Sequence, residues 1–137
     1  MERFLGKYEP YIYALLRIIA GFLFVWHGSQ KLFGFPASAR GGELNALTAA
    51  AGAIELVGGL MIMLGLFAGF AAFIASGTMA FAYFIAHGLN AFLPIQNGGE
   101  LAVIYCFLFL YIAARGSGLI SLDSLLRRNG GEARALG

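Results

Sequence analysis

The chain has 137 residues, of which 60% are hydrophobic and only 12% are charged; its mean hydropathy is +0.80 and its formal net charge is +2. Soluble domains carry about 25% charged residues, so this composition excludes an ordinary soluble protein and predicts an integral membrane protein. The small positive charge does not indicate a nucleic-acid partner. The single cysteine, Cys106, excludes an intramolecular disulfide and a dithiol redox motif.

Long apolar segments follow one another along the chain and predict membrane-spanning helices. They cover about 12–35, 44–67, 70–89 and 97–114. Each is close to the roughly 20 residues that span a bilayer, but the last reaches this length only if residues 97–100 precede the apolar run Leu101–Ala114. We therefore expect an all-α, antiparallel four-helix bundle that forms one domain, followed by a tail over 115–137. The first segment is too long for the core of a signal peptide and carries Arg17 and Lys31, so we expect it to be retained.

The basic residues outside the spans predict the orientation of the bundle. Those that precede the first span or follow the last are Arg3, Lys7, Arg115, Arg127, Arg128 and Arg134. The opposite side has only Arg40, with Lys31 near a helix end. Positive loops stay in the cytoplasm, so both termini are expected there, in a multi-pass protein of the inner membrane. The arginine-rich tail would contact anionic headgroups.

The polar side chains of the spans are expected to face the bundle. At 100° per residue, Arg17, His27 and Lys31 fall on one stripe of the first helix, because they lie within an arc of about 100°. Glu55 shares its face with small residues such as Gly52 and Gly59, which allow close helix contact. Depths estimated from the helical rise place one cluster in the outer half of the bundle. Its members are His27, Lys31, Glu55, His87, Asn97 and Glu100. Glu55 is expected to contact a cation of the first helix, and the estimated depths favour Lys31 or His27 for this contact. Arg17 lies deeper and is expected to be an intramembrane charge partner.

This cluster has more than one interpretation. Intramembrane ionisable groups often mark ligand or proton sites, and Phe24, Trp26 and Tyr83 would supply aromatic walls for a flat ligand. The same groups would also serve as buried ion pairs that fix the order of the helices. A metal site is not predicted, because no helix carries a close pair of ligands such as His at i and i+4.

Five pieces of the sequence, in order, resemble the DoxX family of small four-helix membrane proteins. They are "LLRIIAGFLF", "HGSQKLFG", "AAAGAIELVGGLMIMLGLFAGFAA", "NGGELAVIY" and "RGSGLISLD", spread over residues 11–123. The recurrent polar positions of that family match Arg17, Lys31, Glu55, Asn97, Glu100, Ser121 and Asp123 here. Ser117 replaces the proline of the commoner Gly-Pro-Gly form. The resemblance implies a membrane subunit of a quinone-linked oxidoreductase or a partner of thiol-handling complexes.

Three functions are compatible with the sequence. In the first, the chain is the membrane partner of an oxidoreductase and has a quinone-sized pocket in its outer half; no cofactor is built in, so a quinone or a partner subunit would carry the electrons. In the second, it is a small transporter or channel for an anion or a proton-coupled solute, and four short helices would then need a homo-oligomer. In the third, it is an assembly scaffold without a ligand.

Overall fold

The computed structural model describes residues 2–37, 44–87 and 91–135, and every regular element in them is helical, as predicted. The elements are α1 (Glu2–Leu5), the 3₁₀ turn η1 (Gly6–Tyr8), α2 (Glu9–Phe33), α3 (Ala46–Ala53), the π-helical turn η2 (Ile54–Gly58), α4 (Gly59–Leu64), α5 (Ala68–Ala82), the π-helical turn η3 (Tyr83–His87), α6 (Pro94–Asn97), α7 (Glu100–Arg115) and α8 (Leu122–Ala135). Arg40 and the last two residues of the predicted third span lie outside the described residues.

Three helical rods in the described part of the chain are long and apolar enough to cross a membrane. They are Arg3–Phe33, Ala46–Leu64 and Ala68–His87. The predicted fourth span corresponds to α7, whose 16 residues extend for about 24 Å, less than the roughly 30 Å of the hydrocarbon core. Large apolar side chains such as Leu15, Phe73 and Phe107 are more than 60% exposed on the outside of the helices, where a bilayer would cover them.

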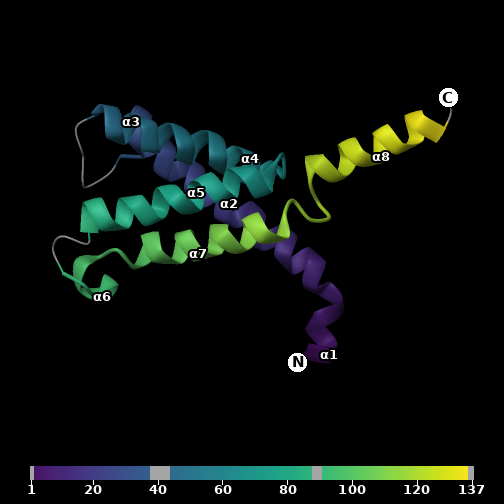
Figure 1. The fold of residues 1–137 in the computed structure, drawn as a ribbon, viewed down its shortest axis with the longest axis horizontal. Coiled ribbons are helices and arrows are strands. Elements are labelled where there is room, and N and C mark those ends of the chain that lie inside the picture. Colours follow the sequence, from purple (N-terminus) through teal and green to yellow (C-terminus); the bar gives the residue numbers. More distant parts are fainter. Residues whose placement is uncertain (1, 38–43, 88–90, 136–137) are drawn as a thin grey trace.

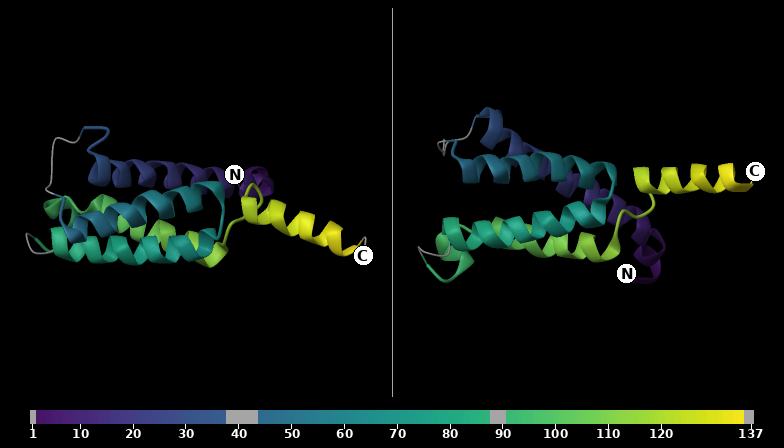
Figure 2. Two further views of the ribbon diagram at one scale, coloured as in Figure 1. Left: turned by 90° about the horizontal axis from the view of Figure 1, so that it is seen from above. Right: turned by 45° about the horizontal axis from the view of Figure 1, so that its top comes forward.

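The helices pack as two layers: α2 and the helices of the second rod form one, and α5 and α7 form the other (Figure 1). The rod formed by α3, η2 and α4 packs against α2, while α5 packs against α7 and, through η2 and α4, against that rod. We call the end with the α4–α5 turn and the start of α8 the tail end. The opposite end, with the C-terminus of α2 and with α6, is the loop end. Figure 2 shows α8 projecting beyond the bundle at the tail end.

Glycines bring α2 and the second rod into backbone contact. A Cβ atom on Gly21 would lie 2.7 Å from the carbonyl oxygen of Gly59, and one on Gly28 would lie 2.7 Å from that of Gly52. The two glycines of each helix are seven residues apart, so they recur on one face after about two turns. Small residues permit such an approach between membrane helices, and the sequence had indicated it for the second helix.

Aromatic side chains fill the space between α2 and α7. Phe24 is 1% exposed, and its ring centroid lies 4.6 Å from that of Phe109 and 5.7 Å from that of Tyr105. The rings of Tyr105 and Phe109 are stacked at 5.3 Å. Large side chains thus join these two helices, whereas small ones join α2 to the second rod.

Candidate functional site

An ion pair with a buried carboxylate joins α2 to the second rod in the loop-end half of the bundle. The ammonium of Lys31 donates a hydrogen bond to Glu55 Oε1, which confirms the prediction that a cation of the first helix contacts Glu55. The Glu55 side chain is 1% exposed, whereas that of Lys31 is 37% exposed. The pair is therefore open on its cationic side only.

The second carboxylate oxygen of this pair is available as an acceptor. Glu55 Oε2 is buried and accepts no hydrogen bond from the described residues. A buried polar atom without a partner costs about 1–3 kcal/mol, and a bound water, ion or ligand is one explanation for such an atom. Arg17 Nε at the tail end is a second buried atom of this kind among the described residues. The charge of Glu55 also acts on His27 and Tyr105, whose ring centroids are 6.0 Å apart.

Local backbone geometry distinguishes the positions of these ionisable residues. Glu55 lies in the π-helical turn η2, and His87 lies in the second such turn, η3. A π-helical turn holds one extra residue; such turns are rare and frequently occur at functional sites. The insertion changes the direction of the side chains after it, which a regular 100° spacing does not anticipate.

A second polar group at the loop end holds the segment before α7 in place. The Asn97 side chain donates to the hydroxyl of Tyr83 (3.1 Å) and to the Ala91 carbonyl (2.9 Å), and it accepts from the Gly99 N–H (2.7 Å). His87 Nδ1 lies 3.0 Å from the Asn97 carbonyl oxygen. These bonds tie the end of η3 to α6, so in this structure they organise the connection.

The six predicted cluster residues thus fall into two groups and one outlying residue. His27, Lys31 and Glu55 form the first group, which we call the ion-pair site, and His87 and Asn97 belong to the second. Glu100 is exposed at the start of α7. Among the predicted aromatic walls, Phe24 packs in the core, Tyr83 binds Asn97 and the Phe92 carbonyl, and Trp26 contacts Phe22 and Phe35. Tyr105, which sequence reasoning did not single out, borders His27.

Arg17 occupies the tail end and binds backbone rather than Glu55. Its guanidinium donates to the carbonyls of Ile62 and Ile120 and, at 2.9 Å, to that of Met63. Ile62 and Met63 lie in the last turn of α4, where carbonyls lack partners within the helix and carry partial negative charge. Arg17 is fully buried. It therefore caps α4 and fixes the segment after α7 to it.

Asp123 also stabilises the tail end, through hydrogen bonds with the α4–α5 turn and with Ser117. Its carboxylate accepts the Phe67 N–H at 2.9 Å and the Ser117 hydroxyl at 2.5 Å, while its own N–H donates to the Gly65 carbonyl at 3.1 Å. Burial opposes its charge, but the hydrogen bonds from Ser117 and Phe67 and the charges of Arg127 and Arg17 outweigh this effect and lower its pKa. The "RGSGLISLD" segment thus closes the α4–α5 turn.

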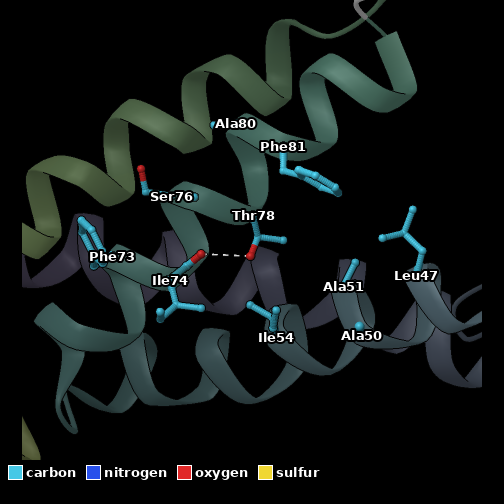
Figure 3. A pocket seen from close by; sticks show the side chains of 11 residues that line it. Leu47, Ala50, Ala51, Ile54, Phe73, Ile74, Ser76, Thr78, Ala80 and Phe81 are labelled. Atoms are coloured by element: carbon cyan, nitrogen blue, oxygen red, sulfur yellow. Dashed lines mark hydrogen bonds between the residues drawn. The ribbon is translucent and has the colours of Figure 1, made fainter.

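An apolar groove of about 530 Å³ lies between the second rod and α5, and none of the ion-pair residues is among those that line it (Figure 3). Leu47, Ala51 and Ile54 form one wall, and Phe81 belongs to the opposite one. Polar atoms on α5 are satisfied locally, since the Thr78 hydroxyl donates to the Ile74 carbonyl and the Ser76 hydroxyl donates to the Cys106 carbonyl. The groove therefore offers an apolar surface suited to lipid chains.

No group of three or more His, Cys, Asp or Glu side chains in residues 2–37, 44–87 and 91–135 is placed to hold a metal ion. The polar chemistry of the described chain is that of ion pairs and hydrogen bonds.

Comparison of the sequence with known proteins identifies the family of this chain. The profile of the DoxX family matches residues 12–88, which include Arg17, Lys31 and Glu55. The chain belongs to the DoxX family. It is also 46% identical over 126 residues to an uncharacterised protein of Haemophilus influenzae, and the match covers 88% of this chain and 94% of that protein. No solved structure matches the chain. With its apolar helices, this DoxX family protein is a membrane protein.

Proposed function

We propose that this protein is the membrane subunit of an oxidoreductase complex and that it accepts a quinone-type ligand at the ion-pair site. In this proposal the bundle crosses the inner membrane four times, with both termini in the cytoplasm and the loop end on the outer side. The basic residues of the N-terminal segment and the tail support this orientation. The electrons would come from a partner subunit.

The observation that carries the proposal is the incomplete pairing of Glu55. Oε2 is a buried acceptor that lacks a partner in the described chain, and Lys31 is a partly exposed donor beside it. His27 and Tyr105 add a titratable ring and an aromatic hydroxyl. The two oxygens of a quinone accept hydrogen bonds, which the Lys31 ammonium and the Tyr105 hydroxyl would donate. Glu55 Oε2 can only accept, so its partner would be a hydroxyl of the reduced form, the quinol.

The same residues would exchange the protons that accompany quinone reduction. A quinone takes up two electrons and two protons to become a quinol. An imidazole ring can take up and release a proton, so His27 would exchange protons with the ligand, and Glu55 would accept a hydrogen bond from a quinol hydroxyl. The ion-pair site would therefore bind the head group and exchange protons with it.

Binding of a short-chain quinone to the purified protein tests the proposal. Trp26 is the only tryptophan and adjoins His27 in sequence, so we expect a saturable decrease in its fluorescence and an increase in melting temperature. Lys31→Met should abolish both effects, while Lys7→Met, a control at the tail end, should retain them.

A different result would favour transport. If saturating quinone changes neither the Trp26 fluorescence nor the melting temperature, the quinone proposal is wrong. An anion or proton flux in liposomes that responds to Lys31→Met would then indicate a small oligomeric transporter.

A further inference from the structure

The first helical rod is longer than the hydrocarbon core of a membrane. Its 31 residues, Arg3–Phe33, would extend for about 46 Å as a helix, while the core is about 30 Å thick. Counting about 20 residues back from Phe33 leaves the segment up to Tyr13 beyond the core at the tail end. The 3₁₀ turn η1 interrupts the helix in this segment. The segment before Tyr13 is thus placed at the level of the headgroups.

An apolar groove of about 310 Å³ starts at this level. Leu5 and Gly6 lie at one side, Ile12 and Leu16 continue the groove along α2, and Tyr111 of α7 closes it. Leu16 and Ile12 are 41% and 48% exposed, so the groove faces the surroundings of the bundle. It runs from the headgroup level toward the hydrocarbon core.

A set of contacts centred on Arg115 fixes the walls of this groove. Arg115 binds Glu9 through both of its terminal nitrogens (2.5 and 2.7 Å), and its guanidinium carbon lies 4.4 Å from the centroid of the Tyr13 ring. It also lies 3.3 Å from the hydroxyl of Tyr111. Glu9, Tyr13 and Tyr111 all line the groove. The α2 and α7 walls are therefore held in one geometry before any ligand binds.

Two basic residues lie next to this end of the groove in the sequence. Arg3 and Lys7 flank the lining residues Leu5 and Gly6, and Glu9, the acidic residue among those that line the groove, is paired with Arg115. The Lys7 ammonium lies 4.9 Å from the Tyr8 ring centroid and 5.5 Å from that of Phe4. Aromatic rings of this kind prefer the membrane interface. Basic residues near the surface attract anionic lipids.

We infer that this groove is a binding site for an anionic phospholipid. One acyl chain lies along Ile12, Leu16 and Tyr111, and the phosphate meets Arg3 and Lys7. A zwitterionic lipid would fit the same apolar wall, but it would gain less from the two cations. The site is separate from the ion-pair site, which is at the opposite end of the bundle.

Titration of phosphatidylglycerol into the purified full chain in detergent, read by native mass spectrometry, tests this site. Phosphatidylcholine and inorganic phosphate serve as comparison ligands. The double variant Arg3→Gln/Lys7→Gln should bind phosphatidylglycerol roughly 30-fold more weakly, since each basic residue near the surface contributes to binding. The control Arg127→Gln/Arg128→Gln removes the same charge from α8 and should keep the wild-type affinity.

A second pair of variants tests the apolar wall without changing charge. Leu16→Ala should weaken binding of phosphatidylglycerol by roughly fivefold, and Leu23→Ala, seven residues further along α2, should not. The inference is overturned if phosphatidylcholine or phosphate alone binds as tightly as phosphatidylglycerol. Equal losses in the two double variants, or none in either, would also overturn it.

Discussion

Each end of the bundle has a cationic side chain of α2, Arg17 at the tail end and Lys31 at the loop end, but the two differ in burial and in the groups that they bind. At the tail end, all the hydrogen bonds that Arg17 donates to described residues go to backbone carbonyls. At the loop end, Lys31 pairs with a carboxylate and remains 37% exposed. Backbone carbonyls cannot leave or change charge, whereas a carboxylate can be protonated and an exposed ammonium can change partner. The comparison therefore favours a structural role for Arg17 and a binding role for Lys31.

Removing Arg17 should have the largest effect. Arg17→Met would remove the side-chain donor of the Met63 and Ile120 carbonyls, and the Ile62 carbonyl would keep only the Gly65 N–H; a buried polar group left without its partner costs about 1–3 kcal/mol. We expect a loss of about 4 kcal/mol in the free energy of unfolding, measured by denaturant titration in detergent. Arg17→Lys should recover only part of it, because an ammonium lacks the planar fork. A loss below about 1 kcal/mol would contradict the structural role.

The two partners at the loop end should not be equivalent. Lys31→Met leaves a buried carboxylate uncompensated and should cost about 3 kcal/mol. Glu55→Gln leaves Lys31 able to reach water, and should cost about 1 kcal/mol. The double variant Lys31→Met/Glu55→Leu should be more stable than Lys31→Met alone. Equal losses for the two single variants would mean that Lys31 is as deeply buried as Arg17.

A substitution in the close contact between α2 and the second rod tests how much this contact contributes to the stability of the bundle. Gly28→Ala would place a methyl group 2.7 Å from the Gly52 carbonyl oxygen, and overpacking of this kind costs about 1–3 kcal/mol. Gly77→Ala is the matched control, since a Cβ there meets no atom within 4 Å and alanine favours a helix. A Gly28→Ala protein as stable as Gly77→Ala would show that the helices separate easily.

Side chains that attract each other were more predictable from sequence than side chains that bind backbone. The apolar runs located the second rod, predicted at 44–67 and observed at Ala46–Leu64, because hydrophobicity determines what lies in lipid. Opposite charges at similar depth predicted that Lys31 or His27 pairs with Glu55, and the structure shows Lys31 in that position. Arg17 was correctly predicted to face the bundle, but its acceptors belong to residues 45, 46 and 103 positions away. Every residue has a backbone carbonyl, so the sequence does not indicate which carbonyls Arg17 binds.

The π-helical turns were also not predicted. They require one extra residue in a turn, and neither composition nor apolar spacing marks that residue. The π-helical turn η3 and the hydrogen bonds of Asn97 determine the structure of the loop end. The sequence therefore predicted one cluster of polar residues where the structure shows two groups. Tyr105 was missed because its apolar neighbours on α7 give it the pattern of a core residue.

The smallest effect should be a pH dependence at the tail end. The pKa of Asp123 is lowered in the folded protein: burial opposes its charge, but hydrogen bonds from Ser117 and Phe67 and nearby arginines more than compensate. A carboxylate with a lowered pKa stabilises the fold fully above its unfolded value of about 3.9 and loses this contribution as the pH falls through the folded value. Asp123 is half-buried at the surface, where solvent screens its charge, so we expect a contribution of less than about 1 kcal/mol. Melting temperatures measured between pH 7 and pH 3 should fall more steeply for the wild type than for Asp123→Asn. The amide variant should already be slightly less stable at pH 7, because it keeps the geometry of the turn but not its charge. Parallel pH profiles for the two proteins would mean that the α4–α5 turn does not depend on the charge of Asp123.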